Sequence, residues 1–99
     1  MNYRLRLTPD AADDLQRLFD FLAEQDLPAA RRARQAIEQA FAFLGSFPFA
    51  CRKISDGQPF LREIVIEFGH TGYVALFEIE RHDTVTVLAV RHQREDDFY

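Results

Sequence analysis

The sequence predicts an α+β domain of two layers, in which a helical hairpin packs on a small antiparallel sheet in the order β-α-α-β-β-β. Three observations lead to this fold class. Residues 60–91 contain three runs of strand character separated by short turns, which is typical of an antiparallel meander. Residues 9–44 repeat apolar side chains at helical spacing in two segments. One more alternating run precedes the helices. Because a sheet and a helix pair each bury one apolar face, they pack as two layers.

The composition fits one folded domain that spans residues 1–99. Ninety-nine residues can form one modest hydrophobic core and are too few for two. The chain is 47% hydrophobic and 28% charged, which is ordinary for a globular protein. It has neither an apolar run long enough to span a bilayer nor a signal-peptide pattern. A single cysteine, Cys51, excludes an internal disulfide. We therefore expect a cytoplasmic protein without membrane contact.

The first strand is predicted over residues 2–8, where apolar and polar side chains alternate. The first helix should then begin with Thr8 as N-cap and Pro9 at the first helical position. It should continue to about Gln25. Its apolar stripe consists of Ala11, Leu15, Leu18, Phe19 and Leu22.

A second helix is predicted between Asp26, its N-cap, and Gly45, its stop. Its apolar stripe consists of Ala30, Ala33, Ile37, Ala40, Phe41 and Leu44. Its other side carries three closely spaced arginines, Arg31, Arg32 and Arg34. Such a group is either a solvated helix face or a patch that receives an acidic partner. A short connection between two amphipathic helices predicts an antiparallel hairpin.

The second half of the chain is predicted as a loop followed by a meander. Residues 47–59 contain two prolines and a turn signal at Asp56-Gly57, so we expect an ordered loop there, and it carries the basic pair Arg52 and Lys53. Three strands should follow, over residues 60–68, 73–80 and 84–91.

Two arginines, Arg62 and Arg91, fall on the apolar phase of their strands. A meander can bring both guanidinium groups onto one sheet face, where they would form a site for a carboxylate or a phosphate. The alternative is a structural ion pair. Its acidic partner would be one of Glu63, Glu78, Glu80 or the carboxylates of the tail. The sequence leaves both readings open.

The sequence predicts no metal site, no cofactor and no catalytic nucleophile. The three histidines lack the spacing of metal ligands, and the four glycines form no phosphate-binding loop. Cys51 has no predicted base to activate it. The net charge of −4 is opposite to the surplus of Lys and Arg that binding to phosphate backbones favours. We therefore expect no direct binding to DNA.

Segments along nearly the whole chain resemble the ParE branch of the RelE/ParE toxin superfamily. They follow one another in the order that the family shows, and they are residues 7–15, 29–31, 47–48, 61–64, 72–79 and 87–96. The resemblance implies a small toxin encoded beside an antitoxin, with the fold predicted above. It also implies that the antitoxin wraps an extended and helical tail around the toxin, giving a hetero-oligomer.

The resemblance implies one of two modes of action. ParE-like members poison DNA gyrase, whereas RelE-like members cleave messenger RNA in the ribosome with basic residues on the sheet and a C-terminal Tyr or His-Tyr. Arg62 and Arg91 match two of these basic positions, and Arg52 or Lys53 could supply a third. The same four residues are the candidates for binding a target, a phosphate or a carboxylate.

The tail favours the ParE reading. Residues 95–97 are acidic where the nuclease would carry its catalytic aromatic or imidazole, and carboxylates repel RNA. His92 or Tyr99 would be the acid or base in a nuclease. The expected function is a type II toxin that inhibits DNA gyrase by protein binding and contains no catalytic site. The alternatives are a RelE-like endoribonuclease and a degenerate toxin kept as an antitoxin-binding partner.

The cognate antitoxin is the second expected partner. Antitoxin tails are typically acidic and amphipathic, so Arg31, Arg32 and Arg34 are the candidate antitoxin-binding residues. DNA binding by the complex would then belong to the antitoxin.

Overall fold

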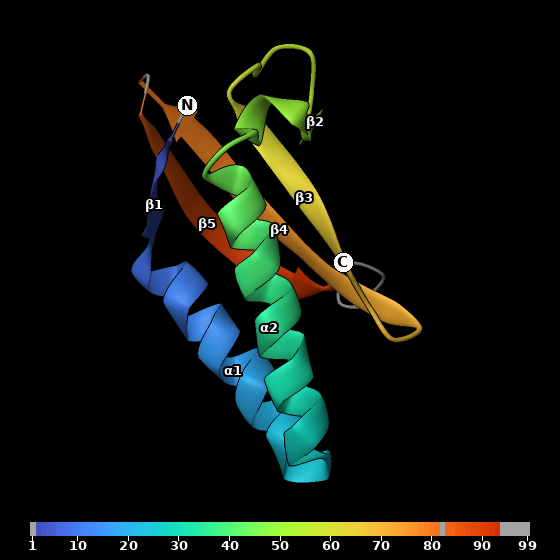
Figure 1. The fold of residues 1–99 in the computed structure, drawn as a ribbon. Helices are drawn as coiled ribbons and strands as arrows, with labels where there is room; N and C mark the ends of the chain where they lie inside the picture. The colour runs from blue at the N-terminus through green and yellow to red at the C-terminus, as the bar shows by residue number, and fades with distance from the viewer. Residues whose placement is uncertain (1, 82, 94–99) are drawn as a thin grey trace.

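The structure is a computed structural model and describes residues 2–81 and 83–93 (Figure 1). Its elements are, in order, β1 (Arg4–Leu7), α1 (Pro9–Gln25), α2 (Leu27–Leu44), the 3₁₀ helix η1 (Pro48–Ala50), β2 (Arg52–Lys53), β3 (Leu61–Phe68), β4 (Thr71–Glu80) and β5 (Thr84–His92). The strands form one sheet in the order β1-β5-β4-β3-β2. Both helices lie on one face of it (Figure 1). The predicted two-layer α+β fold is confirmed.

The sheet differs from the prediction in two respects. β1 pairs with β5 in parallel, so the sheet is mixed, with antiparallel pairing everywhere else. β2 is a fifth strand of two residues inside the predicted loop. It is too short to show an alternating pattern in the sequence.

The helix boundaries agree with the predicted caps. Thr8 Oγ1 accepts a hydrogen bond from the Ala11 N–H at 3.1 Å, and Pro9 occupies the first helical position. Asp26 has two roles, because its N–H donates to the Leu22 carbonyl at 2.8 Å while its carboxylate accepts from the Ala29 N–H at 3.0 Å. One residue thus ends α1 and begins α2, which makes the hairpin sharp.

The core lies between the helix pair and the central strands. Phe77 on β4 is fully buried at its centre. Around it are buried side chains from both helices and from β3, β4 and β5, chiefly Leu18, Ile37, Leu44, Ile66, Ile79, Val85, Val87 and Val90. Burying this set is the main stabilising contribution to the fold. No helix in the described part of the chain is both long and apolar enough to cross a membrane.

A β-bulge at Leu88 changes which side chains of β5 face the helices. Leu76 pairs with Ala89 and Phe77 pairs with Val87, so Leu88 is an extra residue without a counterpart on β4. α1 holds this region in place. Thr8 Oγ1 donates to the Leu88 carbonyl at 3.2 Å, and the carboxylate of Asp14 accepts from the backbone N–H of Val90 at 3.0 Å. The N-terminal part of α1 therefore holds β5 at Leu88 and Val90, next to the end of β1.

Candidate functional site

The guanidinium group of Arg62 holds the segment between α2 and β3 together. Its Nε donates to the Pro59 carbonyl at 2.9 Å, and its Nη1 donates to the carbonyls of Phe49 at 3.1 Å and Cys51 at 2.8 Å. Its Cζ also lies 5.2 Å from the centroid of the Phe49 ring. Much of the hydrogen-bonding capacity of this arginine is therefore used within the chain.

Arg91 lies on the opposite face of the sheet from Arg62. Arg62 pairs with Phe77, on the face that the helices cover, whereas Arg91 pairs with Val74, on the open face. The expectation that the two guanidinium groups share a face is therefore wrong. Its cause is the bulge at Leu88, which reverses the alternation for the last residues of β5.

The basic pair on β2 also points to two different faces. Lys53 pairs with Arg62, so these two cations lie on one face. Arg52 pairs with Glu63, and its Nε lies 2.5 Å from the Glu63 carboxylate. The sequence suggested Glu63 as an ion-pair partner of Arg62 or Arg91, but the structure gives this carboxylate to Arg52.

Of the remaining nuclease candidates, His92 lies away from Arg62. The Nε2 atom of His92 lies 2.8 Å from the Thr71 hydroxyl, and its ring meets Tyr73 edge-on with centroids 5.6 Å apart. His92 is level with Ile66, four residues from Arg62 along β3, which is roughly 13 Å. Tyr99 and the acidic residues 95–97 lie outside the described residues.

Cys51 is not activated as a nucleophile. Burial raises the pKa of its thiol, and the nearby positive charge of Arg62 offsets this only in part. The thiol therefore stays protonated at neutral pH. Among residues 2–81 and 83–93, no three side chains of His, Cys, Asp or Glu lie together in a way that could hold a metal ion.

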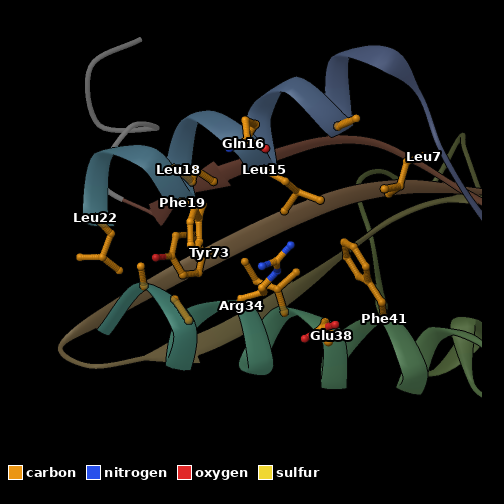
Figure 2. A pocket seen from close by; sticks show the side chains of 14 residues that line it. Leu7, Leu15, Gln16, Leu18, Phe19, Leu22, Arg34, Glu38, Phe41 and Tyr73 are labelled. Atoms are coloured by element: carbon orange, nitrogen blue, oxygen red, sulfur yellow. The ribbon is translucent and has the colours of Figure 1, made fainter. Parts of the chain in front are cut away.

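A groove of about 520 Å³ lies between α1 and α2, with the sheet as its floor (Figure 2). Its lining is mostly apolar. The lining residues are Leu7, Ala12, Leu15, Gln16, Leu18, Phe19, Leu22, Ala30, Ala33, Arg34, Ile37, Glu38, Phe41 and Tyr73. We define these residues as the interhelical groove.

Of the three arginines singled out on α2, only Arg34 lines the interhelical groove. Its Cζ lies 5.3 Å from the centroid of the Phe19 ring, so it reaches across from α2 to α1. Arg31 and Arg32 are exposed on the same helix outside the groove. The predicted basic group is thus divided between the groove rim and the outer surface.

Tyr73 contributes the polar group of the groove floor. The residue is only 4% exposed, and its ring is stacked on Phe68 with centroids 6.3 Å apart. Burial raises the pKa of its phenol, so the hydroxyl remains a neutral hydrogen-bond donor at physiological pH. Sequence reasoning missed this residue because it reads as one more core aromatic in a strand.

The residues that line the groove were not predicted either, for a related reason. Every apolar residue of the two helical stripes was assigned to the core, which leaves none to line a cavity. The usable signal is the set of small side chains Ala12, Ala30 and Ala33, which line the groove from both helices. Because an alanine side chain fills little space, part of the space between the helices is left unfilled.

Comparison with known proteins gives the family. A family model described as the ParE toxin of the type II toxin–antitoxin system parDE matches residues 5–97. A chain from the chromosomal ParDE toxin–antitoxin system of P. aeruginosa superposes with a TM-score of 0.72 and 22% identity, covering 91% of this chain and 95% of that one. A chain from the RelBE2 toxin–antitoxin complex of Mycobacterium tuberculosis superposes with a TM-score of 0.64 and 24% identity, covering 94% of this chain and 100% of that one. No curated protein sequence matches. Because the family model spans nearly all of the sequence, the chain belongs to the ParE toxins of type II toxin–antitoxin systems.

Proposed function

We propose that this toxin acts in the cytoplasm by binding DNA gyrase and that a cognate antitoxin neutralises it. Membership of the ParE family supports the first part. The observation that favours binding over RNA cleavage is the separation of the cations. Cleavage of a phosphodiester needs positive groups that converge on one phosphate. Here Arg62 donates to three carbonyls of its own loop and Arg91 lies on the other face.

We assign the antitoxin to the interhelical groove. The two similar structures are described as toxin–antitoxin systems or complexes, which supports an antitoxin partner. A long apolar groove between two helices is the usual acceptor for an amphipathic helix. Arg34 on its rim and Arg31 and Arg32 nearby favour an acidic segment, chiefly by speeding its association.

The target is tested with purified components. The toxin at micromolar concentration should inhibit supercoiling by gyrase, and adding the antitoxin should restore it. Ribosome-bound messages should stay intact in cells that express the toxin. Uninhibited gyrase would refute the assignment of the target, and messages cut within codons would instead establish the endoribonuclease.

Replacing Ala12 by Trp should block the groove. Ala12 is exposed on α1 and lines the groove, so an indole can fill the space without displacing the core. We expect the antitoxin to bind about a hundredfold more weakly, or about 2.7 kcal/mol. The free energy of unfolding of the toxin should change by less than about 0.5 kcal/mol. Calorimetric titration and urea denaturation measure the two quantities.

The matched control is Ala42→Trp, because Ala42 is exposed on α2 but does not line the groove. This variant should bind the antitoxin as the wild type does. If both substitutions weaken antitoxin binding equally, or if neither weakens it, the antitoxin binds on another surface.

A further inference from the structure

The hydroxyl of Tyr73 is a polar group without a hydrogen-bond partner in the part of the chain that the structure describes. No hydrogen bond joins it to any of residues 2–81 and 83–93. In the same residues every fully buried side-chain nitrogen or oxygen has a partner, so the Tyr73 hydroxyl is still reached by solvent. Since the rest of this side chain is enclosed and Tyr73 lines the groove, the solvent reaches it from the groove (Figure 2).

The position of this hydroxyl is fixed. The Tyr73 ring is held by stacking on Phe68 and by the edge-on contact with His92. His92 is itself tied to the Thr71 hydroxyl at 2.8 Å. The phenol therefore cannot turn away when a partner fills the groove.

A fixed donor beneath an apolar groove distinguishes between occupants. A purely apolar segment would strip water from the hydroxyl and leave the donor unpaired, which is costly. A segment with an oxygen acceptor at that point would replace the lost water. The rim adds further requirements, because Arg34 favours an acidic residue and Glu38, one turn along α2, favours a basic one.

We propose that the Tyr73 hydroxyl selects the segment that fills the interhelical groove. The selected segment is an amphipathic helix whose apolar face is interrupted once, by a carboxylate or amide oxygen that accepts a hydrogen bond from Tyr73. The same helix places an acidic residue against Arg34. This inference rests on the proposed antitoxin site and adds the rule by which the groove rejects apolar helices of the same shape.

The test uses the complex of this chain with the antitoxin of its own module. Tyr73→Phe removes only the hydroxyl, and the complex should then dissociate about tenfold faster. Tyr3→Phe is the matched control, since Tyr3 packs at the edge of the core and does not line the groove. It should leave the dissociation rate unchanged. Thermal unfolding of the free toxins checks that both variants are folded.

A second set of variants separates selection from a structural role. Each Asp, Glu, Asn and Gln in the groove segment of the antitoxin is replaced by Leu. One replacement should speed dissociation about tenfold from wild-type toxin and have no effect on Tyr73→Phe toxin. A complex that Tyr73→Phe leaves unchanged or makes longer-lived overturns the inference, because an apolar occupant gains when the unpaired hydroxyl is removed. If wild-type toxin forms no complex with the antitoxin, the proposed antitoxin site fails as well, so the two failures are distinguishable.

Discussion

Replacing Gly72 by Ala should lower the free energy of unfolding by about 3 kcal/mol or more. Gly72 is buried near the start of β4, opposite Glu67. A methyl group there would lie 2.1 Å from the carbonyl oxygen of Ile66 and 3.2 Å from the Cα of Glu67. Both are backbone atoms, so the clash is relieved only if β3 and β4 move apart. Urea denaturation measures the loss of stability, and the midpoint temperature of thermal unfolding should fall by roughly 15 °C.

The matched control is Gly57→Ala. A Cβ added at Gly57 meets nothing within 4 Å, and the residue does not need a positive φ. This substitution should be neutral, or stabilising by a few tenths of a kcal/mol through the unfolded chain. If Gly72→Ala is as mild as the control, β3 and β4 can move apart at little cost in free energy, and the predicted clash is wrong.

The Gly72→Ala substitution should also affect binding. The neighbouring residue is Tyr73, so antitoxin binding should weaken together with stability.

The sequence predicted the elements whose signals are local. Both helix starts agree because Thr8, Pro9 and Asp26 act through bonds that span only a few residues. The three predicted meander strands correspond to β3, β4 and β5, because their strand-like runs are long and the turns between them are short. Gly69 takes the left-handed conformation, with a φ of 62°, that a tight hairpin requires between β3 and β4.

Features that depend on distant pairing were not predictable in this way. The parallel pairing of β1 with β5 joins the two ends of the chain, and nothing in residues 4–7 encodes its partner. The bulge at Leu88 is stabilised by Thr8, a residue eighty positions earlier. Because the extra residue in β5 was not predicted, Arg91 was assigned to the face that the helices cover, whereas it lies on the open face.

The sequence predicted which residue types take part in the candidate site better than it predicted where those residues lie. Arg34 was singled out for a partner and does line the groove, whereas Arg62 was singled out for a phosphate and instead binds its own loop. Sequence patterns show which side chains leave the apolar phase. They do not show whether a carbonyl of the same chain already lies in reach, because that depends on how a loop folds back.

Replacing Arg62 by Ala should lower the free energy of unfolding by about 2 kcal/mol and loosen residues 47–60. Three carbonyls would lose their charged donor, and the Phe49 ring would lose the cation that it packs against. Arg62→Lys should not restore the loss, because one ammonium group cannot reproduce the planar fork of a guanidinium. Hydrogen exchange of residues 47–60 should speed up in both variants.

Arg52→Ala provides the comparison, because the Arg52–Glu63 ion pair is largely exposed on the arginine side and should contribute less than about 1 kcal/mol.

The two Arg62 variants also separate two roles for this residue. If the guanidinium organises the loop, toxicity and loop protection should fall together in Arg62→Ala and Arg62→Lys. If Arg62→Lys keeps full stability and slow exchange but is no longer toxic, the guanidinium contacts the target directly. The predicted anion-binding role would then be correct despite the three carbonyls.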